Sequence, residues 1–242
     1  MKQNQQVQKK EKAFTWKEMQ GKKAKVSLST GNLKLKSDDV TRFIIWNLPA
    51  EETCPFATPH CKACCYAKKA EKNYPGCLPA REKNLAFSKS AEFVPFMIKA
   101  IHDISSKPAY KKAQHITVRI HESGDYYNYG YLIAWLKIAM ACTDIPNIDF
   151  ASYTKSTPYL KKAKAAGYDI KKYIRFNSSL WDDTEPERIE ETIEMDLPIY
   201  TAYETRAMFP KDFAECKCDN CSHCRKCFHG EKAEKKVAVV IH

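Results

Sequence analysis

The chain of 242 residues contains no uninterrupted run of eighteen apolar residues, and its polar N-terminus has no apolar signal core. Both absences argue against a membrane-spanning helix and a secretory leader. We therefore expect a soluble, cytoplasmic protein with no membrane partner. The sequence also has neither a GxGxxG nor a GxxxxGK(S/T) motif, which disfavours a nucleotide-binding, doubly wound fold.

Positive charge is concentrated at one end of the chain. Residues 1–36 contain ten lysines and two glutamates, a net charge of +8, which leaves only +3 of the formal +11 for the rest of the protein. A basic arm over residues 1–23 can follow a phosphate backbone, so nucleic acid is a candidate partner. The alternative is a solvated, flexible tail, because no arginine accompanies these lysines.

Strand-like and helix-like stretches alternate along most of the chain. Runs of β-branched and aromatic residues predict strands at 24–29, 41–47, 115–121, 148–153, 172–177, 198–203 and 236–241. Helical patterns lie between them at 79–89, 90–105, 129–142, 157–167 and 184–196. This alternation predicts an α/β fold with parallel strands, arranged as an open doubly wound sheet or as a complete or partial (β/α) barrel.

Unusual polar sequences follow five successive predicted strands, and this favours the barrel. In α/β barrels the active site is built from loops that leave the carboxyl ends of the strands. We therefore expect a partial barrel of the TIM-barrel type as a core over residues 24–210, with a cluster loop at 54–65. A Cys-rich metal-binding segment follows at 211–229, and residues 230–242 return to the core as a strand.

Eleven cysteines, an odd number without an export signal, indicate metal binding rather than disulfides. Four of them lie in the loop after the second predicted strand, namely Cys54, Cys61, Cys64 and Cys65. The adjacent Cys64 and Cys65 point their side chains apart, so three ligands is the natural count. A four-iron (4Fe-4S) cluster held by three cysteines keeps one iron open for a small molecule, whereas four thiolates close a zinc site or an electron-transfer cluster.

A second cysteine group occupies twelve residues near the C-terminus and consists of Cys216, Cys218, Cys221, Cys224 and Cys227. Zinc ribbons normally separate two cysteine pairs by a dozen or more residues, and no such spacer is present here. Consecutive two-residue gaps are typical of runs that wrap iron–sulfur clusters. We expect a second iron–sulfur cluster at this group, and zinc assisted by His223 or His229 is the alternative.

Three stretches, CPFATPHCKACCYAKK, VRIHESGDYYNYGYLIAWLKIA and FASYTKS, resemble the phage gene product 88-like family over about residues 25–229. That family has a Cys-Pro start, a Cys-Tyr-Ala finish, and strands ending in Ser-Gly-Asp and Tyr-Thr-Lys. The Cys-Tyr-Ala finish falls on Cys65, so the resemblance favours Cys65 over Cys64 as the third ligand. The layout is also similar to radical S-adenosylmethionine (SAM) enzymes, although their usual cysteine spacing is three and then two residues, against six and then two or three here.

The resemblance implies roles for polar residues at the strand ends. The implied catalytic residues are Glu122, Asp125 and Lys155, and the implied cofactor-binding residues are Ser123, Gly124, Asp125, Tyr153, Asn177 and Glu204. Each has a simpler alternative: Asp125 caps the next helix, Glu122 pairs with Arg119, and Lys155 faces solvent. We expect His121 to be a hydrogen-bonded core residue and not a ligand.

Together these expectations describe an iron–sulfur enzyme of radical SAM-like type. Its first cluster would bind SAM at the open iron, the second would be auxiliary, and an electron donor would be a partner. Two alternatives stay open. One is a nucleic-acid-binding phage protein in which zinc or iron–sulfur sites are structural, and the other is an iron–sulfur redox protein that does not use SAM.

Overall fold

The computed structural model describes residues 26–32, 34–217 and 220–241, which form an open eight-stranded sheet with helices packed against it. The strands are β1 (Leu28–Ser29), β2 (Thr41–Trp46), β3 (His115–Ile120), β4 (Ile148–Thr154), β5 (Arg175–Leu180), β6 (Ile199–Tyr203), β7 (Ala214–Glu215) and β8 (Lys236–Val240). The helices are α2 (Pro59–Ala63), α3 (Tyr66–Asn73), α4 (Cys77–Ser88), α5 (Phe93–Ser105), α6 (Pro108–Lys111), α7 (Tyr129–Ala141), α8 (Thr157–Ala165), α9 (Pro186–Glu194), the 3-10 turn η1 (Arg206–Met208) and α10 (Cys221–Cys224). The predicted basic arm, residues 1–23, lies outside the described residues.

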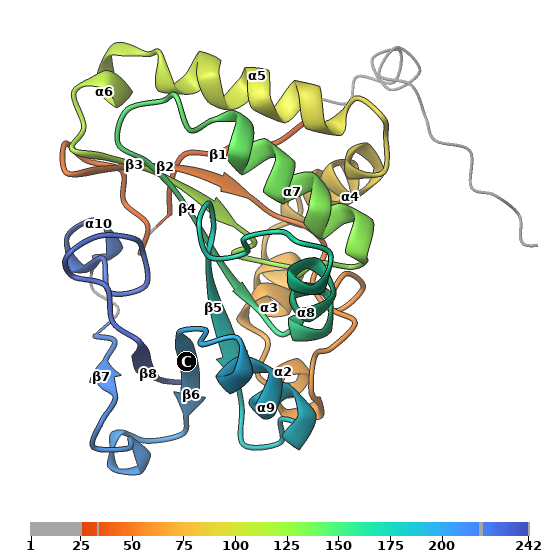
Figure 1. The fold of residues 1–242 in the computed structure, drawn as a ribbon, viewed down its shortest axis with the longest axis vertical. Helices are drawn as coiled ribbons and strands as arrows, with labels where there is room; N and C mark the ends of the chain where they lie inside the picture. Colours follow the sequence, from red (N-terminus) through yellow and green to blue (C-terminus); the bar gives the residue numbers. More distant parts are fainter. Residues whose placement is uncertain (1–25, 33, 218–219, 242) are drawn as a thin grey trace, which may run out of the picture.

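The order of the strands is β1-β2-β3-β4-β5-β6-β8-β7, and β1 alone among them is antiparallel to its neighbour. When parallel strands follow one another in chain order, right-handed crossovers place the connecting helices on one face of the sheet. Figure 1 shows α5 and α7 on one side of the sheet and α10 on the other. The order lacks the central reversal that defines a doubly wound sheet, so of that alternative only the open sheet is confirmed.

The sheet does not close into a barrel. Its two edge strands, β1 and β7, are only two residues long and do not pair with each other. Closure requires a continuous ladder around the whole sheet. The structure therefore establishes a mixed α/β fold with an open sheet, and not a closed barrel.

Alternation along β2 divides the core between the two faces of the sheet. Ile44 and Trp46 belong to the larger cluster, beneath the helices, while Phe43 and Ile45 belong to a second cluster with Phe228. Side chains of a strand alternate between faces, so these two sets point in opposite directions. The Cys-rich segment that contains Phe228 therefore covers the face opposite the helices.

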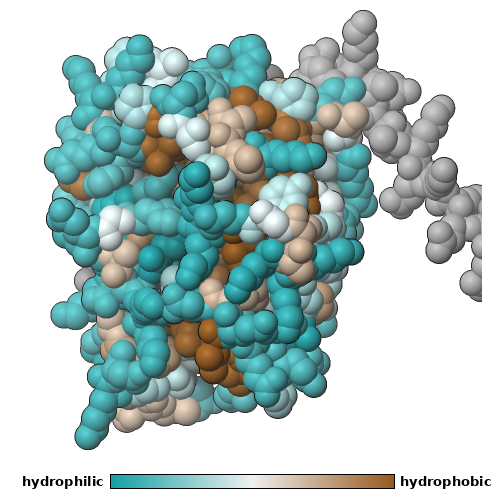
Figure 2. Space-filling view, viewed as in Figure 1, coloured by the Kyte–Doolittle hydropathy of each residue, from teal (hydrophilic) through white to brown (hydrophobic). Residues whose placement is uncertain are grey.

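The surface seen in Figure 2 is mostly hydrophilic, with hydrophobic side chains visible as narrow strips between polar ones. The longest helices in the described part of the chain, α5 and α7, have thirteen residues each. In that part, no helix has the length and apolar character needed to cross a bilayer.

Candidate functional site

The loop after β2 and the loop after β3 are joined by backbone and side-chain hydrogen bonds. The side chain of Asn47 accepts from the backbone N–H groups of Glu122 and Ser123, at 2.8 and 3.0 Å. The Leu48 N–H donates to the Ser123 carbonyl at 3.0 Å, and the Ser123 hydroxyl donates to the Leu48 carbonyl at 2.9 Å. These bonds fix the start of the cysteine loop at the edge of the sheet where β2 and β3 end, here called the carboxyl edge.

Gly124 completes this junction because a larger residue does not fit. Its φ is +84°, and a Cβ atom there would lie 2.5 Å from the Thr53 hydroxyl and 2.7 Å from the Leu48 Cβ. Both the backbone conformation and the close approach require glycine. The implied cofactor-binding residues Ser123 and Gly124 therefore act by holding the cysteine loop, and the buried Ser123 hydroxyl is occupied by that bond.

Three cysteines of the first group converge in this loop. Burial, together with the nearby carboxylate of Asp125 and the Cys61 and Cys65 thiols, raises the pKa of Cys54 to about 12. Burial also raises the pKa of Cys61, while the Lys155 ammonium acts in the opposite direction. The fourth cysteine, Cys64, is the C-cap residue of α2, and its N–H donates to the His60 carbonyl. The structure thus brings together the three thiols that the sequence and the resemblance single out as ligands.

Among the described residues, one set of three or more His, Cys, Asp or Glu side chains has all its ligand atoms within 4.8 Å, and it is His60, Asp182 and Asp183. Within the part of the chain that the structure describes, neither cysteine group is as compact as that set.

Asp125 is buried and satisfied by three donors. Its carboxylate accepts from the Thr154 hydroxyl at 2.6 Å, from the Lys155 N–H at 2.8 Å and from the Tyr126 N–H at 2.7 Å. Burial raises the pKa of Asp125, and these bonds oppose the rise. The cap of α7 is Asn128, whose side chain accepts from the Tyr131 N–H at 2.8 Å. The helix-cap alternative for Asp125 is therefore wrong, and the residue instead ties the end of β3 to the end of β4.

Lys155 points into the protein and not to solvent. The residue is 9% exposed, and its ammonium donates to the carbonyl and the hydroxyl of Ser179, at 3.0 and 2.8 Å. Burial lowers the pKa of Lys155, while the nearby Cys61 and Asp125 oppose that change. The solvent-facing alternative is wrong, and the structure places a buried cation beside the first cysteine group.

Glu122 and Arg119 do not form the ion pair offered as an alternative. The Glu122 carboxylate accepts from the side-chain amides of Asn32 and Asn47. The Arg119 guanidinium lies instead over the ring of Tyr153, 3.6 Å from its centroid. Glu122 is therefore held at the surface of the carboxyl edge while Arg119 is buried on the face covered by the Cys-rich segment.

His121 is a hydrogen-bonded core residue, as predicted. It is 2% exposed, and its Nε2 lies 2.9 Å from the Tyr131 hydroxyl. Burial, followed by the charge of Arg119, lowers the pKa of His121 to about 3. The imidazole is thus uncharged at neutral pH and takes no part in either cysteine group.

Three cysteines of the second group also converge, at α10 and just after it. Burial raises the pKa of Cys221 to about 11, the Cys227 and Cys224 thiols act in the same direction, and Arg119 opposes them. Cys227 is buried, and this burial raises the pKa of its thiol. A hydrogen bond with Tyr153 and the charge of Arg119 oppose the rise without cancelling it. Of the other two members, Cys216 directly follows β7, and Cys218 lies outside the described residues.

Two residues implied to bind a cofactor lie at this second group instead of the first. The Asn177 side chain donates to the carbonyl of Cys227 at 3.1 Å, and Tyr153 lies beside the Cys227 thiol. Glu204 is exposed in the loop after β6, where its charge contributes to raising the pKa of His60. The implied cofactor residues therefore divide between three places and do not form one pocket.

The sequence analysis missed His60, Asp182 and Asp183. The His60 Nδ1 lies 2.6 Å from Asp182, and the His60 N–H donates to Asp183 at 2.8 Å. The bond to Asp182 raises the pKa of His60. Both aspartates are exposed, so the set joins the cysteine loop to the loop after β5 and carries no metal assignment by itself. The signal that could have found it is the pair of acidic residues directly after the strand.

The Cys-rich segment is fastened to the sheet by a buried arginine. Arg225 pairs with Asp149 at 2.5 Å and donates to the hydroxyls of Thr41 and Thr117 at 3.1 and 3.3 Å. The side chains of Arg225 and Asp149 are 6% and 9% exposed. A buried pair with additional hydrogen bonds fixes the position of the segment to which it belongs.

Asp38 provides a second attachment and makes it pH-dependent. Burial raises its pKa, but hydrogen bonds from the Ser222 hydroxyl and from the Thr41 and Val40 N–H groups outweigh this and lower it to about 2. A folded-state pKa below the unfolded value stabilises the protein above about pH 4, and that contribution is lost as the pH falls towards 2.

We expect the free energy of unfolding of Asp38→Asn to fall less steeply than that of the wild type between pH 4 and pH 2. Unfolding at each pH is followed by tryptophan fluorescence. An Asp39→Asn control, at an exposed pair with Arg42, should keep the wild-type profile.

Comparison with known proteins gives a family but no solved relative. The family model described as "Gene product 88" matches residues 10–230. The "Gene 88 protein" of Mycobacterium phage D29 is 24% identical over 206 residues, which cover 75% of this chain and 80% of the phage protein. No solved structure matches the chain.

Proposed function

This chain belongs to the gene product 88 family, and we propose that it is an iron–sulfur enzyme whose first cluster is bound by Cys54, Cys61 and Cys65. The observation that carries the proposal is the convergence of these thiols beside a buried lysine and a buried aspartate at the carboxyl edge. Three thiols are the number that keeps one position of a four-iron cluster open.

The open sheet fits this function as a partial barrel. Six strands, β2 to β6 and β8, are parallel neighbours, and five of them follow one another in direct chain order. Such a segment gathers the loops at its carboxyl edge in the same way as a complete barrel. The second cysteine group, on the face opposite the helices, would hold an auxiliary cluster through Cys221, Cys224 and Cys227, with Cys216 or Cys218 as a further ligand.

The residues around the first group have separate tasks in this proposal. A cluster with an open iron, when bound, would supply the electron that cleaves SAM and generates an adenosyl radical. The Lys155 ammonium offsets the negative charge of the thiolates, and Asp125 holds the backbone that positions Lys155. Glu122, held by Asn32 and Asn47 and only partly buried, presents a carboxylate that can accept the amino group of SAM.

The number of thiols at the first group also favours a cluster with an open iron. A closed zinc site would require a fourth ligand. The electron-carrier alternative requires a fourth thiolate at the first group, and Cys64 is not among the groups that most affect the pKa of Cys54 or Cys61.

The test is electron paramagnetic resonance of the reconstituted, reduced protein with and without SAM. We expect about eight irons per chain and a signal from the first cluster that changes when SAM is added. A Cys221→Ala/Cys224→Ala double variant serves as the control, because it should lose the second signal and keep the SAM-dependent one. An unchanged spectrum at saturating SAM would contradict SAM use, and zinc without iron would contradict the iron–sulfur assignment altogether.

A further inference from the structure

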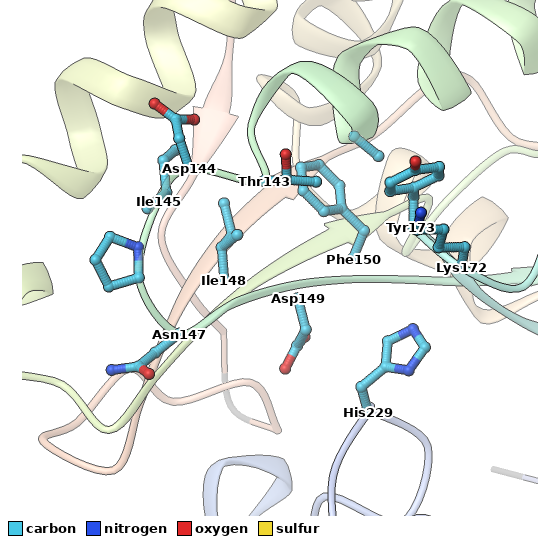
Figure 3. Close-up of a pocket in the computed structure, with 12 residues that line it drawn as sticks. Thr143, Asp144, Ile145, Asn147, Ile148, Asp149, Phe150, Lys172, Tyr173 and His229 are labelled. Atoms are coloured by element: carbon cyan, nitrogen blue, oxygen red, sulfur yellow. The ribbon is translucent and has the colours of Figure 1, made fainter.

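A cavity of about 380 Å³ opens at the opposite end of the sheet from the cysteine loop, beside the start of β4. Figure 3 shows Ile148 and Phe150 on one face of β4, with Tyr173 and Lys172 beside them, and Asp149 on the other face, directed towards His229 of the Cys-rich segment. Small-molecule sites typically occupy about 300–1,000 Å³. This cavity lies away from the first cysteine group, because Lys155 lies past the other end of β4, roughly 20 Å along the strand. His229 places it next to the segment that carries the second group.

The cavity exists because β5 does not accompany β4 from its beginning. Ile148 at the start of β4 pairs with Ile116 of β3, but pairing with β5 starts only at Ala151 and Arg175. The first residues of β4 therefore have a neighbouring strand on the β3 side but none on the β5 side. The residues before β5 and the loop that carries His229 frame the gap.

Two buried polar atoms on the cavity wall have no hydrogen-bond partner among the described residues. They are the Oδ1 atom of Asp149 and the Nε2 atom of His229. The other oxygen of Asp149 pairs with Arg225 at 2.5 Å, and the Thr117 hydroxyl also lies beside the carboxylate, so the carboxylate is held in place. Buried polar atoms normally have a hydrogen-bond partner. Two such atoms without one on the wall of a cavity indicate that a ligand can supply the partner.

The other residues that line the cavity indicate what kind of ligand would fit it. Ile145, Ile148, Phe150 and Tyr173 contribute apolar and aromatic surface. Lys172 lies at the exposed rim, with its ammonium 5.1 Å from the centre of the Tyr173 ring. A carboxylate oxygen can only accept, so the ligand must offer N–H or O–H donors to it. Aromatic walls favour a flat body.

We propose that this cavity binds an amino-substituted heteroaromatic base of the guanine type, with its N–H edge towards Asp149 and His229 and its ring beside Tyr173. A guanine edge carries two adjacent N–H donors, which match one carboxylate oxygen and an imidazole nitrogen. The Lys172 ammonium at the rim suits a phosphate attached to such a base. The site does not involve the proposed first cluster.

The experiment is a titration of the full-length protein with guanosine, followed by ligand-observed NMR, with inosine as the chemical control. Inosine lacks the exocyclic amine and leaves a buried acceptor unpaired. We therefore expect its affinity to be about tenfold lower than that of guanosine. His229→Ala should weaken guanosine binding by a similar factor. His223→Ala, an exposed histidine on the same segment, should leave it unchanged.

Further arms with guanosine monophosphate and a single-stranded oligoguanylate distinguish a free nucleotide from a base in nucleic acid, since the tighter binder identifies the source. The guanosine–inosine comparison uses only the wild-type chain, so it does not depend on any variant folding. The proposal is overturned if guanosine shows no saturable binding, if inosine binds equally well, or if His229→Ala binds as tightly as His223→Ala.

Discussion

Alanine at Cys61 is expected to remove about four irons per chain, while alanine at Cys64 should leave the iron content unchanged. Cys54, Cys61 and Cys65 act on one another electrostatically at the carboxyl edge, and Cys61 also lies beside Lys155. Cys64 is adjacent to Cys65 but is not among the groups that most affect the pKa of Cys54 or Cys61. We therefore expect alanine at Cys65 to lower the iron content as alanine at Cys61 does, and alanine at the adjacent Cys64 to have no effect on it.

The measurement is iron and sulfide per chain after anaerobic reconstitution of wild type, Cys61→Ala and Cys64→Ala, with absorbance near the cluster bands as a second readout. Far-UV circular dichroism checks that each variant is folded. Cys77→Ala, at the start of α4, is a further control that should keep all of its iron. Equal iron loss in Cys64→Ala and Cys61→Ala would remove the basis for an open iron and favour a closed electron-transfer cluster.

The strands were largely predictable because they are short, β-branched runs between helical patterns. Those predicted at 41–47 and 115–121 match β2 and β3 to within one residue at the end, whereas β5 begins three residues later than predicted. The delay matters, because the residues before β5 line the cavity beside β4. Local propensity could not reveal it, since the start of β5 is set by pairing with Ala151.

The arrangement of the two cysteine groups was only partly predictable. The spacing and the resemblance pointed to the three thiols that converge in the first loop. Nothing in the local pattern indicated that the Cys-rich segment would lie across the face opposite the helices, where Arg119 and Tyr153 adjoin Cys227. That placement depends on contacts between residues more than a hundred positions apart, such as Arg225 and Thr117.

Replacing Arg225 with methionine is expected to lower the free energy of unfolding by about 3–5 kcal/mol, because it leaves a buried carboxylate without its partner. The affected carboxylate is that of Asp149, whose side chain is 9% exposed. The matched control is Lys235→Met, which removes an ion pair to Asp196 with both side chains mostly exposed. Such exposed pairs contribute about 1 kcal/mol or less.

Urea unfolding of the two variants, with the metal content of each sample determined, measures the difference directly. The double variant Arg225→Met/Asp149→Leu separates the two causes, because removing both charges should restore much of the stability if the unpaired carboxylate is the source of the loss. Limited proteolysis adds a positional readout, since a detached Cys-rich segment should be cleaved within 211–235 before the rest of the sheet. If Arg225→Met loses no more stability than Lys235→Met, Arg225 does not fasten the segment. The second cysteine group must then be held against the sheet by its other contacts, which include the Ser222–Asp38 and Asn177–Cys227 hydrogen bonds and the packing of Phe228.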